Sequence, residues 1–99
     1  MARPQRLDGA EITRRLQGLP GWELMDGKLH RQFTFANFLE AFRFMTADAA
    51  EAERLQHHPE WCNVYDRVTV DLVTHDVRGI TVLDFELAGR CQQLAGGAR

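Results

Sequence analysis

The sequence predicts an α+β fold in which an antiparallel β-sheet of three to four strands carries three α-helices packed on one face. Three segments open with the residues that commonly cap a helix. Between them, apolar residues recur at every second position, which is typical of half-buried strands. Asp26-Gly27 separates two such runs and signals a tight turn. We therefore expect the order α-β-β-α-β-β-α in a single domain spanning residues 1–99.

Each predicted helix begins with a capping residue that is followed three positions later by an acid. The pairs are Asp8 with Glu11, Asn37 with Glu40, and Thr81 with Asp84. The middle helix is the longest, and its expected apolar stripe consists of Phe38, Phe42, Met45, Ala49 and Ala52. The last helix shows the same spacing at Leu83, Leu87, Cys91 and Leu94. These stripes predict helices that lie on the sheet.

The strands are predicted from the alternating segments. Trp22 to Met25 and Leu29 to Phe35 should pair as a hairpin around Asp26-Gly27. After Pro59, alternation predicts either one long bent strand or two strands joined near Asp66, and both alternatives remain open. Such a sheet keeps an uncovered second face and a free edge. Because both features commonly lead to assembly, we expect a homo-oligomer.

Composition limits the class of protein. The chain has 99 residues, of which 44% are hydrophobic and 26% charged, as in a globular domain. Cys62 and Cys91 fit no disulfide or metal-binding spacing, so we expect reduced, buried thiols. With no apolar leader and no membrane-length apolar run, a cytoplasmic protein without membrane contact is expected. The net charge of −2 and the scattered arginines argue against direct nucleic-acid binding. The expected partner is a small molecule or another protein.

The stretch "ERLQHHPEW", from Glu53 to Trp61, places two histidines before a proline. Proline favours extended geometry in the preceding residue, so the helix should end near His57, and the two imidazoles should point in different directions. Glu53 precedes His57 by one helical turn and is expected to support it. His75 follows the last strand, with Asp76 beside it. Three imidazoles converging on one cavity would suit acid-base chemistry.

The residues alone also allow other interpretations. A histidine at a helix C-terminus can serve only as a cap. His57, His58, Cys62 and His75 are nominal metal ligands, although adjacent histidines seldom chelate one ion and no zinc spacing is present. The spacing of Asp84 favours a capping-box acid over a catalytic one. Trp61 suits the core or the sheet face, but an aromatic ring beside histidines could also stack on a flat heterocycle.

A longer set of residues resembles a known family. It comprises Glu53-x-x-x-His57-His58-Pro59-Glu60-Trp61-x-Asn63-Val64-Tyr65, then Thr74-His75, then Gly79-x-Thr81-x-x-Asp84. Gly21-Trp22, Phe33-x-Phe35 and Ala41-Phe42-x-Phe44-Met45 extend the match. The sequence is similar to the pterin-4a-carbinolamine dehydratase family over nearly its whole length.

This resemblance implies a hydro-lyase that dehydrates 4a-hydroxytetrahydropterin to quinonoid dihydropterin in tetrahydrobiopterin recycling, without a metal or redox cofactor. It implies that His57, His58 and His75 are catalytic and that Glu53 and Asp84 support them. The implied substrate-binding residues are His57, His58, Pro59, Trp61, Thr74, His75 and Asp76. Homodimers or homotetramers are also implied.

A second function remains open, because some members of this family act as protein-binding or dimerisation cofactors, or as assembly factors. A scaffold has no physical reason to keep all three histidines. The complete set in this chain therefore favours the enzyme.

Overall fold

The four strands form one antiparallel sheet in the order β1-β2-β4-β3. A computed structural model describes residues 4–99. Its elements are α1 (Gly9–Leu16), β1 (Glu23–Met25), β2 (Lys28–Thr34), α2 (Phe38–Leu55), β3 (Glu60–Val64), β4 (Arg67–Leu72), the short 3-10 helix η1 (His75–Val77) and α3 (Val82–Ala95). The predicted fold class and element order are confirmed.

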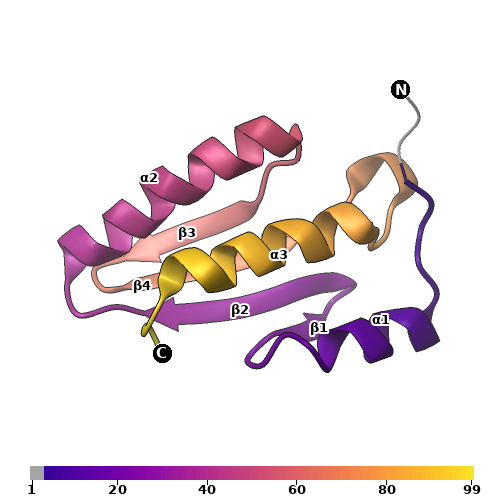
Figure 1. The fold of residues 1–99 in the computed structure, drawn as a ribbon, viewed down its shortest axis with the longest axis horizontal. Helices are drawn as coiled ribbons and strands as arrows, with labels where there is room; N and C mark the ends of the chain where they lie inside the picture. Colours follow the sequence, from indigo (N-terminus) through magenta and orange to yellow (C-terminus); the bar gives the residue numbers. More distant parts are fainter. Residues whose placement is uncertain (1–3) are drawn as a thin grey trace.

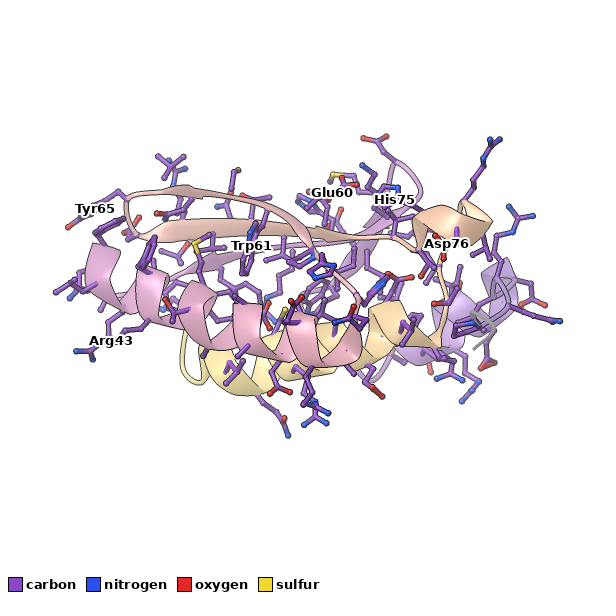
Figure 2. The ribbon with its side chains drawn as sticks, turned by 90° about the horizontal axis from the view of Figure 1, so that it is seen from above. Arg43, Glu60, Trp61, Tyr65, His75 and Asp76 are labelled. Carbon is purple, nitrogen blue, oxygen red and sulfur yellow. The ribbon has the colours of Figure 1, made fainter. Side chains whose placement is uncertain are left out.

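Strands and helices occupy separate layers. Figure 1 shows α2 and α3 side by side along the sheet, and the turned view in Figure 2 shows them on one side of it. The buried residues of the two central strands are Leu29, Phe33, Val68, Val70 and Leu72. They share one core with Ala41, Phe44, Ala52, Phe85, Leu87, Ala88 and Cys91 from the helices. No helix within residues 4–99 combines the length and apolar character that crossing a membrane requires.

Two tight turns connect the strands of two antiparallel pairs, β1 with β2 and β3 with β4. Asp26 and Gly27 both have positive φ, at 53° and 79°, the geometry that a two-residue hairpin favours. The expected first hairpin is therefore confirmed: β1 begins one residue later than predicted, and β2 begins and ends one residue earlier. Tyr65, with φ of 52°, turns the chain between β3 and β4. The segment after Pro59 thus forms two strands rather than one bent strand.

The predicted capping residues do begin the three helices. The Asn37 side chain accepts a hydrogen bond from the Glu40 N–H at 2.9 Å, and Asp8 caps α1 in the same way. Thr81 and Asp84 form a complete capping box at α3. Because caps depend on bonds between residues three apart, the sequence alone locates them.

The predicted apolar stripe of α2 is partly wrong. The buried residues of this helix are Ala41, Phe44, Asp48 and Ala52, whereas Phe38 and Phe42 are about half exposed. Apolar residues occupy two neighbouring faces of α2, and the sheet covers the face that includes an aspartate. A pattern of hydrophobicity selects the other face, because it gives no weight to a buried carboxylate. Leu94 on α3 is likewise 40% exposed.

The two cysteines lie in different environments. Cys91 is buried between α3 and α2, as expected, but Cys62 is exposed. Trp61 is paired with the buried Val70, so Cys62, the next residue, points to the opposite, open face of the sheet. The expectation of a buried thiol is therefore wrong for Cys62.

Asp48 is fully buried between α2 and α3. Its Oδ2 accepts a hydrogen bond from the Cys91 thiol at 3.2 Å, and its Oδ1 has no hydrogen-bond partner among the described residues. Burial raises the pKa of Asp48 from 3.8 to about 6. Burial also raises the pKa of the Cys91 thiol, which stays protonated. The core therefore accommodates neutral Asp48 better than its carboxylate.

We expect Asp48→Asn to stabilise the protein at neutral and alkaline pH. Because the pKa is higher in the folded protein than in the unfolded chain, the folded state binds more protons between these two values, and stability falls as pH rises from about 4 to above 6. The amide removes this loss, which amounts to at most about 3 kcal/mol. Urea unfolding should show a gain of about 1 to 3 kcal/mol near pH 8, and most of that gain should vanish near pH 4.

Glu86→Gln, which neutralises an exposed carboxylate on α3, is the matched control and should change stability little at either pH. An Asp48→Asn variant that is no more stable than the wild type near pH 8 would contradict the burial argument.

Candidate active site

The three predicted histidines lie around one cavity because of the sheet topology. β3 and β4 are antiparallel, and Glu60 at the start of β3 is paired with Asp71 near the end of β4. The residues before β3 therefore lie beside the residues after β4. The resulting cavity of about 130 Å³ is lined by Gln56, His57, His58, Val73, Thr74, His75 and Asp76.

The end of α2 turns His57 toward the core. Gln56 is left-handed, with φ of 52°, and the His57 N–H donates to the Ala52 carbonyl at 3.0 Å. This bond and the Gln56 N–H bond to Glu53 form the arrangement that commonly ends a helix at a left-handed residue. The helix thus ends at Leu55, slightly before the predicted end. His57 is 5% exposed as a result.

His57 is held by a buried carboxylate from α3. Its Nε2 lies 2.6 Å from Oδ1 of Asp84, which is fully buried. Oδ2 of Asp84 accepts from the Thr81 N–H and from the Thr74 hydroxyl, each at 2.8 Å. Asp84 is therefore both the capping-box acid of α3 and the partner of His57. The spacing of Asp84 favoured capping over a catalytic role, but the same side chain both caps α3 and contacts His57.

Glu53 contacts His58 rather than His57. Its Oε1 lies 2.8 Å from Nε2 of His58, and both side chains are exposed. The expected pairing of Glu53 with His57 is wrong, because the helix no longer continues at position 57. The left-handed residue Gln56 directs His57 inward, and the chain then returns His58 to the side of Glu53.

His75 also has a carboxylate partner, which sequence reasoning missed. Its Nε2 lies 3.0 Å from Oε2 of Glu60, and Lys28 Nζ lies 2.5 Å from Oε1 of the same residue. The hydrogen bond from Lys28 keeps the pKa of Glu60 below its usual range. Glu60 stands within the quoted histidine motif, but its partner becomes apparent only from the pairing of β3 with β4.

All three histidines present Nε2 to a carboxylate, from Asp84, Glu53 and Glu60 respectively. A carboxylate only accepts hydrogen bonds, so Nε2 is the donor in the hydrogen bonds of His57 and His58, and Glu60 favours the same proton position in His75. Nδ1 is then the nitrogen that can accept a proton when the ring is neutral. This arrangement is suited to proton exchange with a bound molecule.

The other predicted binding residues lie at different distances from the cavity. Thr74 and Asp76 line it together with His75. Figure 2 shows His75, Asp76 and Glu60 near one another and Tyr65 at the opposite end of the sheet. Trp61 is half-buried and packs against the core, and neither it nor Pro59 lines the cavity.

The nominal metal ligands do not form a coordination site. Cys62 lies on the open face of the sheet, away from the cavity that the three histidines line. Within residues 4–99, no three side chains of histidine, cysteine, aspartate or glutamate lie close enough together to hold a metal ion.

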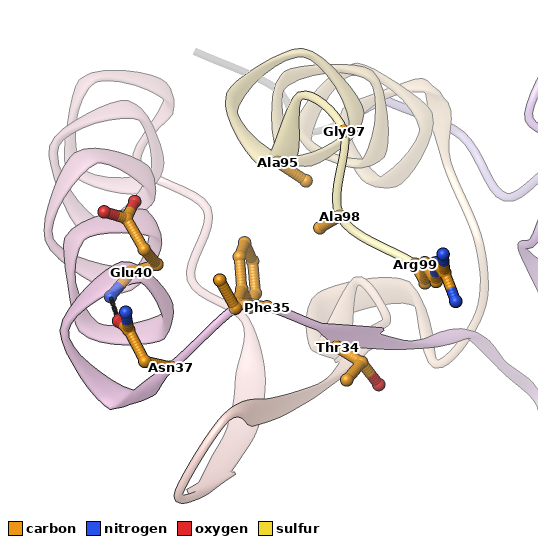
Figure 3. Close-up of a pocket in the computed structure, with 9 residues that line it drawn as sticks. Thr34, Phe35, Asn37, Glu40, Ala95, Gly97, Ala98 and Arg99 are labelled. Atoms are coloured by element: carbon orange, nitrogen blue, oxygen red, sulfur yellow. Dashed lines mark hydrogen bonds between the residues drawn. The ribbon is translucent and has the colours of Figure 1, made fainter.

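A larger hollow of about 640 Å³ lies between the start of α2 and the segment after α3. Figure 3 shows Phe35 in this hollow, between Asn37 and Glu40 on one side and the C-terminal segment on the other. Its lining contains no histidine or cysteine. The smaller cavity, which all three histidines line, is therefore the better candidate for acid-base chemistry.

Comparisons with known proteins point to one family. The sequence model of the family described as "Pterin 4 alpha carbinolamine dehydratase" matches residues 5–94. Two relatives are each named "Putative pterin-4-alpha-carbinolamine dehydratase". The protein from Solibacter usitatus is 50% identical over 93% of this chain and 97% of its own length. The protein from Chelativorans sp. is 53% identical over 96% and 98%, respectively.

A solved structure has the same fold. The crystal structure of a transcriptional coactivator/pterin dehydratase from Brucella melitensis superimposes with a TM-score of 0.90 at 44% identity, covering 93% of this chain and all of that one. Together with the match to the family model over residues 5–94, this shows that the chain belongs to the pterin-4-alpha-carbinolamine dehydratase family.

Proposed function

We propose that this protein is a hydro-lyase that dehydrates 4a-hydroxytetrahydropterin to quinonoid dihydropterin in tetrahydrobiopterin recycling. The proposal rests on one observation: His57, His58 and His75 line the same cavity, and each lies beside its own carboxylate. Membership of the dehydratase family supports the choice of substrate.

The reaction needs one proton delivered and one removed. The C4a–O bond breaks as the hydroxyl takes a proton from a general acid and leaves as water. N5 gives its proton to a general base, and a double bond forms between N5 and C4a. Imidazole can serve in either role near neutral pH, and no electron leaves or enters the pterin.

The three histidines differ in their access to a substrate. His57 is buried and rigidly held, whereas the side chains of His58 and His75 are 62% and 73% exposed. We assign proton exchange with the pterin to this group and substrate binding to the wall formed by Thr74, His75 and Asp76. Pro59 and Trp61 do not line the cavity, so they would contact the substrate only if it extends beyond this wall.

We expect the purified protein to accelerate the dehydration without added metal and to be indifferent to chelator. The histidine nitrogens that face carboxylates are already engaged, and no group of donors within residues 4–99 is arranged to hold a metal ion. The assay follows chemically made 4a-hydroxytetrahydropterin against its spontaneous rate. Activity that EDTA abolishes and zinc restores would overturn this mechanism.

Replacing His58 or His75 with alanine should slow the reaction by roughly 10²-fold or more, since general acid-base groups typically contribute 10² to 10⁴-fold. Both side chains are exposed, so the variants should unfold at nearly the wild-type urea concentration. His30→Ala is the control, because His30 pairs with Asp71 away from the cavity lining. Wild-type rates in both site variants would leave the histidine motif with a structural role.

We also propose that the protein forms a homo-oligomer, either a dimer or a tetramer. Phe38, Leu39 and Phe42 are 44%, 67% and 52% exposed on α2, and β3 is an edge strand of the sheet. An exposed apolar ridge and a free edge are features that assembly commonly covers.

Light scattering at micromolar concentration should therefore report a multiple of 11.3 kDa. Leu39→Glu together with Phe42→Glu should shift the population toward smaller species if the ridge is an interface. A wild-type protein that remains at the monomer mass across this range would refute the oligomer.

A non-catalytic role in binding another protein is the second candidate. The Brucella protein is named as both a transcriptional coactivator and a pterin dehydratase, and the apolar ridge on α2 is available for a partner. The two roles separate experimentally, because the His58 and His75 variants should lose dehydration but keep any binding that uses α2.

A further inference from the structure

Glu60 joins two charged groups from other parts of the chain. Its Oε2 lies 3.0 Å from Nε2 of His75 on η1, and its Oε1 lies 2.5 Å from Nζ of Lys28 on β2. Glu60 itself begins β3. One carboxylate therefore links three elements beside the cavity.

The sheet register explains why these groups meet. Lys28 begins β2, and the residue after it, Leu29, is paired with Leu72 at the end of β4. Glu60 is paired with Asp71 from the other side of β4. Leu29 and Leu72 are buried, so Lys28 and Asp71, each one residue away, project from the open face of the sheet. Glu60 lies on that face too, because it is paired with Asp71. The chain leaves β4 one residue after Asp71 and soon reaches His75.

Electrostatics keep Glu60 in its charged form. The hydrogen bond from Lys28 is the main cause that holds the pKa of Glu60 below its usual range, and the charge of His75 acts in the same direction. The same bond raises the pKa of Lys28 above its usual range. At neutral pH, Glu60 is therefore a carboxylate, and its Oε2, 3.0 Å from Nε2 of His75, favours a proton on that nitrogen.

His75 needs such a restraint more than His57 does. It lies on a three-residue 3-10 helix, and its side chain is 73% exposed. An exposed side chain samples several rotamers, and each one lost on ordering costs free energy at the moment of reaction. A carboxylate already held by Lys28 orders the imidazole before the substrate arrives.

We propose that Glu60, anchored by Lys28, is a positioning residue for His75 that holds the imidazole in one rotamer with its proton on Nε2 and leaves Nδ1 for proton exchange with the substrate. This inference rests on the proposed dehydratase function for its catalytic consequence. The contact itself can be tested separately.

The first test observes His75 directly by nitrogen-15 NMR of the histidine side chains in mildly alkaline solution, where imidazoles are neutral. In the wild type, we expect the proton on Nε2 and three-bond couplings of a single side-chain rotamer. In Glu60→Ala, the Nε2 resonance should move and the couplings should average. The same His75 signals in wild type and Glu60→Ala would overturn the proposal whatever the activity.

The second test measures the dehydration rate. In Glu60→Ala, kcat should fall about 10-fold while KM changes little, because a less ordered imidazole adopts the productive geometry less often. Lys28→Met, which keeps most of the side-chain volume, should lower kcat about 2- to 5-fold, the range expected for one exposed ion pair. The matched control is Glu40→Gln, which removes the exposed ion pair with Arg43 on α2.

The outcomes separate the two proposals. A lower kcat in Glu60→Ala and Lys28→Met, with wild-type kinetics in Glu40→Gln, supports positioning by Glu60. An unchanged kcat in Glu60→Ala, or an equal fall in the control, overturns it. If the wild type itself does not exceed the spontaneous rate, the dehydratase function fails, and the NMR measurement alone decides whether Glu60 positions His75.

Discussion

The geometry of the candidate site depends on the buried carboxylate of Asp84. One oxygen binds His57 from the segment after α2, and the other accepts from Thr74 after β4 and from the N–H of Thr81, the N-cap of α3. Three parts of the chain that are distant in sequence are thereby fixed around a single side chain. In a low-dielectric interior, hydrogen bonds of this kind are strong when complete and costly when broken. Removing either member of the His57–Asp84 pair would leave the other buried without its partner.

A second buried aspartate shows what a complete network contributes. Asp84 has partners on both oxygens, whereas Asp48 receives only a thiol on one oxygen and has an orphaned second oxygen within the described residues. Both residues are fully buried. The carboxylate next to the cavity is therefore fully hydrogen-bonded, whereas the one between α2 and α3 is not. Burial of the ionised form is costly in the helix layer.

The three histidines repeat one chemical arrangement at three degrees of exposure. Each imidazole has Nε2 against a carboxylate, but His57 is buried while His58 and His75 face solvent. The hydrogen bond of the buried pair is shielded from water. The exposed pairs depend on ion pairs that water weakens, and Lys28 reinforces only the pair made by Glu60. His30 differs from all three, because it meets Asp71 through Nδ1 on the open face of the sheet.

The sequence by itself determined the features that rest on local bonds or on a short pattern. Helix caps depend on contacts three residues apart, and the turn at Asp26-Gly27 depends on two backbone conformations, so both follow from neighbouring residues. The fold class follows from the alternation of periods along the chain. The histidine motif and the residues that resemble the family also stand in a few short stretches of the sequence.

Tertiary structure alone decided which face of α2 is buried and which carboxylate serves which histidine. Apolar residues cover two faces of that helix, and only contact with the sheet and α3 selects the one that includes Asp48. The left-handed residue Gln56 separates His57 from Glu53, although their spacing suggests a contact. Asp84 is 27 residues from His57, and Glu60 reaches His75 only across β3 and β4. Such partners are set by the packing of distant segments, because a hydrogen bond requires proximity in space and sequence spacing fixes proximity only within one regular element.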